Sequence, residues 1–378
     1  MKKVFCLILA VIFSNSLIAQ TQKVKGSLAY KDTADLTILN IYPDSFPNVS
    51  VVFKAQTKRG EPIWNLTKDK MNVNENQQNC EVVSLEQISK NKPVNIGIVV
   101  DHSGSMMLDQ KQLFDENGQP LFSFDLNNEP ILPEGYTSPI ENAKSAIKSF
   151  VGTFNVKKDF ISVVGFSNVV DKVLPLTNDI SKVSSVVDSM NADFSTALYD
   201  AMLEGLDKIK TANGVKVLVV LTDGQDNSSK SNWNDVITKA SQLEIPIYII
   251  GLGDVNQDTL QQITTATNGQ FYYTQSSTSL ISVYSVISKQ VQAFYNLVYS
   301  SPNFSSLDST RQLEISFDVD SIYLNTQPAN FKLPKEVVLF LKDKEVEKNY
   351  LIGGGMVLAV VISSGIIFYK RKKKLTNS

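Results

Sequence analysis

Residues that form disulfides or bind transition metals are scarce in this sequence, which has two cysteines and one histidine in 378 residues. Cys6 falls in a predicted leader, which leaves Cys80 without a disulfide partner in its own chain and excludes a disulfide scaffold. The single histidine, His102, argues against a histidine-built zinc site and removes most routes to a Ser-His or Cys-His mechanism. Glycine and proline, at 18 and 13, are too few for a collagen or a low-complexity chain. What remains is the composition of a globular protein, 43% apolar and 20% charged.

The N-terminus has the pattern of a secretory signal peptide over residues 1–19. Lys2 and Lys3 form the basic start, residues 4–13 form the apolar core, and Ala19 is a small residue suited to cleavage. An uncleaved membrane anchor is the alternative, although the apolar run is short for a membrane span.

A second apolar run, at positions 351–369, contains no charge and is followed by five consecutive cations at 370–374. A helix of this length crosses a bilayer, and a basic cluster after it is typical of the cytoplasmic side. We therefore predict a transmembrane helix over residues 350–369 and a cytoplasmic tail over 370–378. The protein would be a single-pass type I protein of the cell membrane, with its N-terminal domain in the periplasm or the extracellular medium. A buried core helix is the alternative.

Charge and spacing restrict the partners. All 38 acidic residues lie in the part predicted to be exported, whereas seven of the 36 basic residues lie in the leader or the tail. An acidic exported part disfavours nucleic acid as a partner.

Within the predicted span, Gly355, Ala359 and Ser363 recur every four residues and offer a face for a homodimer through that helix.

The middle of the chain, residues 92–298, alternates short β-rich runs with helical periodicity, which is the pattern of an α/β sheet. Residues 94–101 are nearly all apolar, as expected for a strand covered on both faces. A capping box with proline at the first helical position, Ser138-Pro139-Ile140-Glu141, predicts a helix start. Six strands with helices between them predict a doubly wound, Rossmann-like sheet.

The flanking segments lack this alternation. Residues 20–91 and 299–334 contain strand-like runs with little helical periodicity, and neither is long enough for a β-sandwich of its own. We predict that they pair into one β-sandwich in which the α/β domain is inserted. Residues 335–349 would form a charged stalk leading to the membrane.

Oxygen-bearing side chains cluster where strands of the predicted sheet end. Asp101, Ser103 and Ser105 follow the first strand, Asp223 follows a later buried strand, and Thr196 opens a helix. Ligands of doubly wound sheets bind beyond the carboxyl ends of the strands. Two carboxylates and three hydroxyls are hard donors suited to Mg²⁺ or Mn²⁺, with Ca²⁺ as an alternative. Because they leave at least one octahedral position open, the carboxylate of a protein partner can complete the shell.

These residues resemble the metal ion-dependent adhesion site (MIDAS) of von Willebrand factor type A (VWA) domains, also called integrin I-like domains. The resemblance rests on Asp101-x-Ser103-x-Ser105, on the Ser-Thr-Ala-Leu-Tyr-Asp-Ala run around Thr196 and on Leu-Thr-Asp-Gly-Gln-Asp-Asn around Asp223. It implies that the serines and the threonine contact the metal and that the aspartates hold it directly or through water. It also implies a sheet order of 3-2-1-4-5-6 with an antiparallel third strand, and a partner that presents Asp or Glu.

Two features depart from this family. Phe194 and Ser195 stand where glycines often precede the threonine. An insert of about 30 residues, 107–137, separates the first motif from its helix, and Asn117-Gly118 within it predicts a hairpin turn. We interpret the insert as a flap that selects a partner or covers the site.

We expect several other polar residues to be solvated or to order local structure, and not to bind a metal. We expect His102 to be a solvated loop residue and Asp226 to order the loop after Asp223 or to cap a helix. A solvated loop is also the preferred reading of the acidic insert residues, over a Ca²⁺ site. These are Asp109, Asp115, Glu116, Asp125 and Glu129.

The predicted function is a membrane-anchored binding module, in cell adhesion or in assembly of an envelope complex, and not an enzyme. A metal-independent envelope scaffold is one alternative. A hydrolase using His102 and Ser103 is another, but the sequence has no Gly-x-Ser-x-Gly elbow. A phosphotransferase is disfavoured because no Gly-x-x-x-x-Gly-Lys loop is present.

Overall fold

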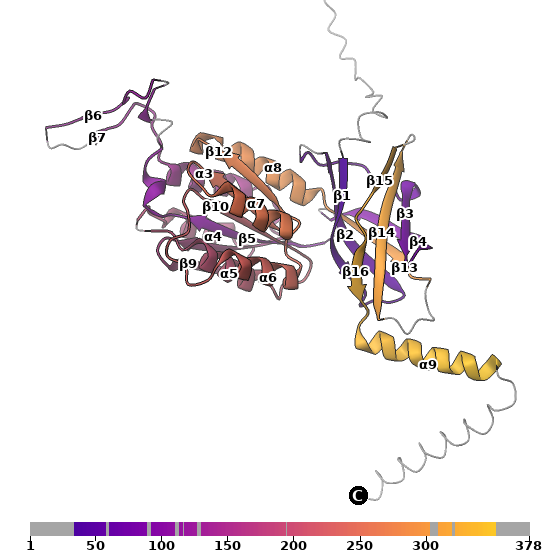
Figure 1. Ribbon diagram of the computed structural model, residues 1–378. Coiled ribbons are helices and arrows are strands. Elements are labelled where there is room, and N and C mark those ends of the chain that lie inside the picture. Colours follow the sequence, from indigo (N-terminus) through magenta and orange to yellow (C-terminus); the bar gives the residue numbers. More distant parts are fainter. Residues whose placement is uncertain are drawn as a thin grey trace, which may run out of the picture.

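The computed structural model describes residues 34–352 apart from 58–59, 89–91, 110–112, 116, 127–129, 194, 303–308 and 320–321. The predicted signal peptide, nearly all of the predicted transmembrane helix and the basic tail lie outside these residues. Among the residues described, no helix is both long and apolar enough to cross a membrane. Figure 1 shows an α/β domain beside a unit built mainly of strands, from which helix α9 (Lys335–Ile352) leads away.

The α/β domain is built on a six-stranded sheet with the order β12-β11-β10-β5-β8-β9. Numbered along the chain, these strands have the order 3-2-1-4-5-6, and the third of them, β9, is antiparallel to β8 while the remaining pairs are parallel. The strands are β5 (Val94–Asp101), β8 (Phe160–Phe166), β9 (Val170–Thr177), β10 (Val215–Thr222), β11 (Ile247–Leu252) and β12 (Gln270–Thr274).

Helices cover both faces of this sheet, which explains why β5 and β10 are mostly apolar. One face is covered by α3 (Pro139–Val151), α4 (Ile180–Asp188) and α8 (Leu280–Gln292). The other face is covered by α5 (Leu198–Ile209), α6 (Trp233–Leu243) and α7 (Gln257–Ala266). The predicted start of α3 is confirmed, since Ser138 accepts a hydrogen bond from the amide of Glu141. The Glu141 carboxylate bonds Lys144 at 2.6 Å.

The strand unit is an eight-stranded sheet that draws on both flanks of the chain. Its order is β1-β2-β13-β4-β3-β14-β15, with β16 paired to β14. The strands before the α/β domain are β1 (Ala34–Tyr42), β2 (Asn48–Thr57), β3 (Met71–Glu75) and β4 (Gln78–Gln87). Those after it are β13 (Tyr295–Ser300), β14 (Thr310–Val319), β15 (Ile322–Asn325) and β16 (Ala329–Lys332). Because β13 lies between β2 and β4, the two flanks share one core.

Direct contacts join the two units. Leu39, Val52 and Ile88 of the strand unit belong to the core under α3 and α8. The Lys54 ammonium donates a 2.8 Å hydrogen bond to the carbonyl of Asn268 in the α/β domain. The segment predicted as a stalk is helical as α9, and its Leu341 packs on the core of the strand unit.

Candidate metal centre

The five predicted ligands lie at the edge of the sheet where β5 and β10 end. Asp101 is the last residue of β5 and Asp223 directly follows β10. These strands are parallel neighbours, so the two loops after them meet. Thr196 comes two residues before α5 and reaches the same edge.

Asp101 is fully buried, and both of its carboxylate oxygens are fixed by hydrogen bonds. Oδ1 accepts a 2.8 Å bond from the amide of Ser103, and Oδ2 accepts a 2.7 Å bond from the hydroxyl of Thr222. Thr222 was not among the predicted residues. The signal that could have found it is a polar residue at the end of an apolar strand, immediately before Asp223.

A chain of hydroxyls leads from the buried carboxylate loop to the surface. The Oγ atoms of Ser103 and Ser105 are 3.1 Å apart, and Ser105 Oγ donates a 2.6 Å bond to Oδ1 of Asp223. Ser103 is buried, whereas Ser105 is exposed. The oxygen cluster is therefore closed on the protein side and open toward solvent.

Gly224 shows how closely Thr196 joins this cluster. A Cβ atom at position 224 would lie 3.2 Å from Oγ1 of Thr196 and 3.7 Å from Oγ of Ser105. Glycine thus keeps free a small space on which hydroxyls from two separate loops converge. Thr196 is held there by Asn227, whose side-chain oxygen accepts from the Thr196 amide at 3.0 Å.

The two carboxylates of the cluster favour a bound cation. Burial, followed by the nearby charge of Asp101, raises the pKa of Asp223 to about 8. Burial also raises the pKa of Asp101, against the opposing effect of its hydrogen bonds. Two carboxylates in one site resist ionising together unless a positive charge offsets them. In the part of the chain that the structure describes, no group of three or more His, Cys, Asp or Glu gathers as a metal site. The donors of this cluster are two carboxylates and three hydroxyls, a set that fits Mg²⁺ or Mn²⁺.

Comparison with known proteins agrees with this architecture. Residues 135–286 match the profile of the von Willebrand factor type A domain. This chain contains a VWA domain. The match begins within the last residues of the insert, so it includes Thr196 and Asp223 but leaves out Asp101, Ser103 and Ser105. In the folded chain, those three residues lie at the same site as Thr196 and Asp223.

Similar proteins share only part of their length with this chain. An uncharacterized protein of Synechocystis sp. is 24% identical over 187 residues, which are 48% of this chain and 37% of that protein. An uncharacterized protein of Borreliella burgdorferi is 28% identical over 137 residues, 35% of this chain and 39% of that protein. The chain thus spans less than half the length of either relative.

The solved structures that align with this chain have low sequence identity to it. A von Willebrand factor type A protein from Catenulispora acidiphila is 12% identical with a TM-score of 0.43, over 80% of this chain and 74% of that one. Proximal thread matrix protein 1 from the mussel byssus, with a zinc-occupied MIDAS motif, is 18% identical with a TM-score of 0.42. That alignment covers 56% of this chain and 48% of the mussel protein.

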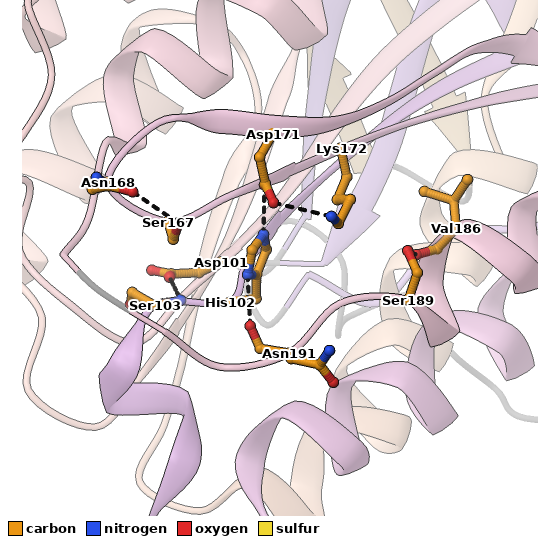
Figure 2. A network of polar contacts seen from close by, with 10 residues as sticks. All are labelled: Asp101, His102, Ser103, Ser167, Asn168, Asp171, Lys172, Val186, Ser189 and Asn191. Carbon is orange, nitrogen blue, oxygen red and sulfur yellow. Dashed lines mark hydrogen bonds and ion pairs between the residues drawn. The ribbon is translucent and has the colours of Figure 1, made fainter.

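His102 of the VWA domain is buried, with 3% of its surface exposed, so the prediction of a solvated loop residue is wrong. Its Nδ1 lies 2.9 Å from the backbone oxygen of Asn191, and its Nε2 lies 2.8 Å from Oδ1 of Asp171 on β9. Figure 2 shows the imidazole between these partners, beside the Asp101–Ser103 loop. The ring nitrogens of His102 are therefore engaged away from Ser103, and the residue anchors the loop to two other elements.

Asp226 and Asp109 stabilise loops around the candidate metal centre. The carboxylate of Asp226 accepts a 2.5 Å bond from the hydroxyl of Ser229, which orders the loop after Asp223 as predicted. Asp109 was predicted to be solvated, and this is wrong because only 5% of it is exposed. It accepts bonds of 3.0 and 2.7 Å from the amide and hydroxyl of Ser277 and so fastens the start of the insert to the domain.

The insert of the VWA domain has two parts. The chain reverses at Asn117-Gly118, as predicted, where Oδ1 of Asp115 accepts from the amides of Asn117 and Gln119 at 2.9 and 2.7 Å. Beyond this turn, β6 (Ser123–Phe124) and β7 (Pro130–Ile131) pair as a short hairpin. Figure 1 shows that this hairpin projects from the end of the domain.

Proposed function

We propose that the VWA domain holds a divalent cation, Mg²⁺ or Mn²⁺, and uses it to bind a carboxylate of a protein partner. The observation that carries this proposal is the convergence of two carboxylates and three hydroxyls, from three separate loops, around the space beside Gly224. The residues that would hold the cation are Asp101, Ser103, Ser105, Thr196 and Asp223. When bound, the cation supplies a positive site to which a carboxylate oxygen of the partner can attach.

The openness of the cluster supports a binding role. Asp101, Ser103 and Thr196 are buried, whereas Ser105 is exposed and Asp223 is partly exposed. A cation among them would be covered on the protein side and accessible from solvent. Two aspartates neutralise a divalent ion without reversing its charge, so an incoming carboxylate is still attracted.

We place this binding module outside the cell membrane, anchored by the transmembrane helix predicted from the sequence, in adhesion or envelope-complex assembly. The support is the order of the sequence signals: a leader pattern, the described domains, and an apolar run followed by five cations. A non-enzymatic role is part of the proposal. The contacts of His102 with Asp171 and Asn191 favour it, because they direct the imidazole away from Ser103.

Thermal unfolding of the full chain with EDTA, Mg²⁺, Mn²⁺ or Ca²⁺ tests the proposal. A cation that binds the folded state stabilises it by about 2.7 kcal/mol at a concentration 100 times its Kd. We expect Mg²⁺ and Mn²⁺ to raise the midpoint. Asp101→Ala should abolish the rise, and the matched control Asp258→Ala, an exposed residue in the first turn of α7, should keep it. An unchanged midpoint in the parent protein would refute the metal site.

A further inference from the structure

The hairpin formed by β6 and β7, with Asp125 and Leu126 that follow β6, is defined here as the arm. Among the residues described in it, Phe124 is 58% exposed, Ile131 is 54% exposed and Leu126 is fully exposed. Two strands of two residues each bury little and gain little stability alone. Exposed apolar groups gathered on such a projection are typical of a surface that another molecule covers.

A groove runs from the metal centre along the base of the insert. Its volume is about 700 Å³, and its lining includes Ser105 and Asp223 from the proposed metal centre. The insert contributes Met107, Leu108 and Phe114 to its walls, with 53%, 51% and 38% of their surfaces exposed. An occupant of this groove must therefore suit a cation at one end and apolar walls beside it.

The arm itself carries a segment that suits both the cation end and the apolar walls of this groove. Asp125 is exposed and stands between Phe124 and Leu126, the two most exposed large apolar residues of the insert. The Phe122 ring connects groove and arm, with centroids 5.7 Å from Phe114 and 5.6 Å from Phe124. A carboxylate flanked by apolar side chains thus lies on the same insert as the groove it matches.

We propose that the arm of one copy of this chain enters the groove of a second copy. The Asp125 carboxylate then completes the shell of the cation, and Phe124 and Leu126 pack against Met107, Leu108 and Phe114. The inference rests on the proposed metal centre. Figure 1 shows the arm extending away from its own domain, which favours a second copy over self-occupation. Because arm and groove lie at the same end of the domain, two copies can exchange arms around a twofold axis, which closes the assembly as a dimer.

Electrostatics make this dimer depend on the cation. Without a metal, Asp125 would approach Asp223 and the exposed Asp254, which both line the groove. Like charges brought together oppose association. With a divalent ion in place, the same carboxylate meets a positive site. Association should therefore require the cation and be reversed by a chelator.

Sedimentation velocity of the full chain in mild detergent, with Mg²⁺ or with EDTA, tests the inference. We expect a dimer with Mg²⁺ and at least tenfold weaker association in EDTA. Asp125→Asn and Asp223→Ala should each remain monomeric, whereas Glu134→Ala, an exposed acidic residue of the insert outside the arm, should dimerise like the parent. A mixture of Asp125→Asn and Asp223→Ala should form heterodimers, because one copy retains an intact arm and the other an intact groove.

Two results would overturn arm exchange: a chain that stays monomeric with Mg²⁺, or a dimer whose association is unchanged by EDTA and by Asp125→Asn. The second result would point to the transmembrane face as the contact. Either leaves the proposed function standing as long as Mg²⁺ still raises the unfolding midpoint. Loss of that rise in the parent protein would instead remove the metal centre and arm exchange together.

Discussion

The Nε2 atom of His102 lies 2.8 Å from Oδ1 of Asp171, and this contact ties the loop of the proposed metal centre to β9. The other ring nitrogen contacts the backbone of Asn191, after α4. A buried side chain with partners on two other elements restricts the backbone between Asp101 and Ser103. The proposed ligands are thereby positioned before any cation arrives.

His102→Ala should weaken the metal centre although His102 is not a ligand. Losing the buried contacts should lower the free energy of unfolding by about 1–3 kcal/mol. It should also lower Mg²⁺ affinity by roughly 10–100-fold, as loss of residues that orient ligands typically does. Urea unfolding and calorimetric Mg²⁺ titration measure the two effects. Unchanged affinity in a folded variant would show that the loop holds its shape without this anchor.

Gly224→Ala should block the cation with little loss of stability. The added methyl group would occupy the space 3.2 Å from Oγ1 of Thr196, where hydroxyls from two loops converge. We expect the Mg²⁺-dependent rise in unfolding midpoint to disappear. Gly152→Ala is the matched control, because its new methyl group meets only backbone oxygens at 3.4 and 3.5 Å. A variant at position 224 that still responds fully to Mg²⁺ would place the cation elsewhere.

Lys54 should make stability depend on pH above neutrality. Burial lowers its pKa to about 8, against a smaller opposing effect of Asp35. An unfolded chain keeps the lysine protonated to about pH 10.4. Between these values the unfolded state binds the extra proton, so the free energy of unfolding should rise with pH, by up to roughly 3 kcal/mol. Urea unfolding at several pH values, compared with Lys54→Met, measures this contribution.

In that comparison, Lys54→Met should lose the rise in the free energy of unfolding with pH. Lys182→Met should keep this rise, since the Lys182 side chain is 67% exposed. Parallel pH profiles for the parent and the Lys54 variant would contradict the assignment.

Breaking the ion pair between Arg311 and Glu75 should destabilise the strand unit. Both side chains are fully buried and 2.6 Å apart. Glu75 also accepts from the hydroxyls of Tyr299 and Ser301 at 2.8 and 2.9 Å. Arg311→Met would leave a buried carboxylate without its cation, at a cost of about 3–5 kcal/mol. Urea unfolding should show that Arg311→Met with Glu75→Gln loses less than the sum of the single variants.

The α/β fold could be predicted because its signals are local. Strands buried on both faces are mostly apolar, as β5 and β10 are, and Ser138-Pro139 marks the start of α3 by backbone chemistry alone. The proposed ligands could be chosen because they stand where strands end, although they are far apart in the sequence.

Other features depend on contacts that no local pattern encodes. The burial of His102 requires Asp171 and Asn191 to come from elsewhere in the chain, and that of Asp109 requires Ser277. From the sequence alone, a charged or polar residue in a loop is predicted to be solvated, because its distant partner is not known. Glu75 and Arg311 are hidden for the same reason, being 236 residues apart.

The joint between the two units has a mechanical consequence. Only Ala293 and Phe294 separate the end of α8 from β13, and β13 lies hydrogen-bonded between β2 and β4. Tension applied at the far end of the α/β domain would reach the interior of a sheet rather than a flexible tether. To give way there, a strand would have to slide past both neighbours at once, so the attachment is built to carry load.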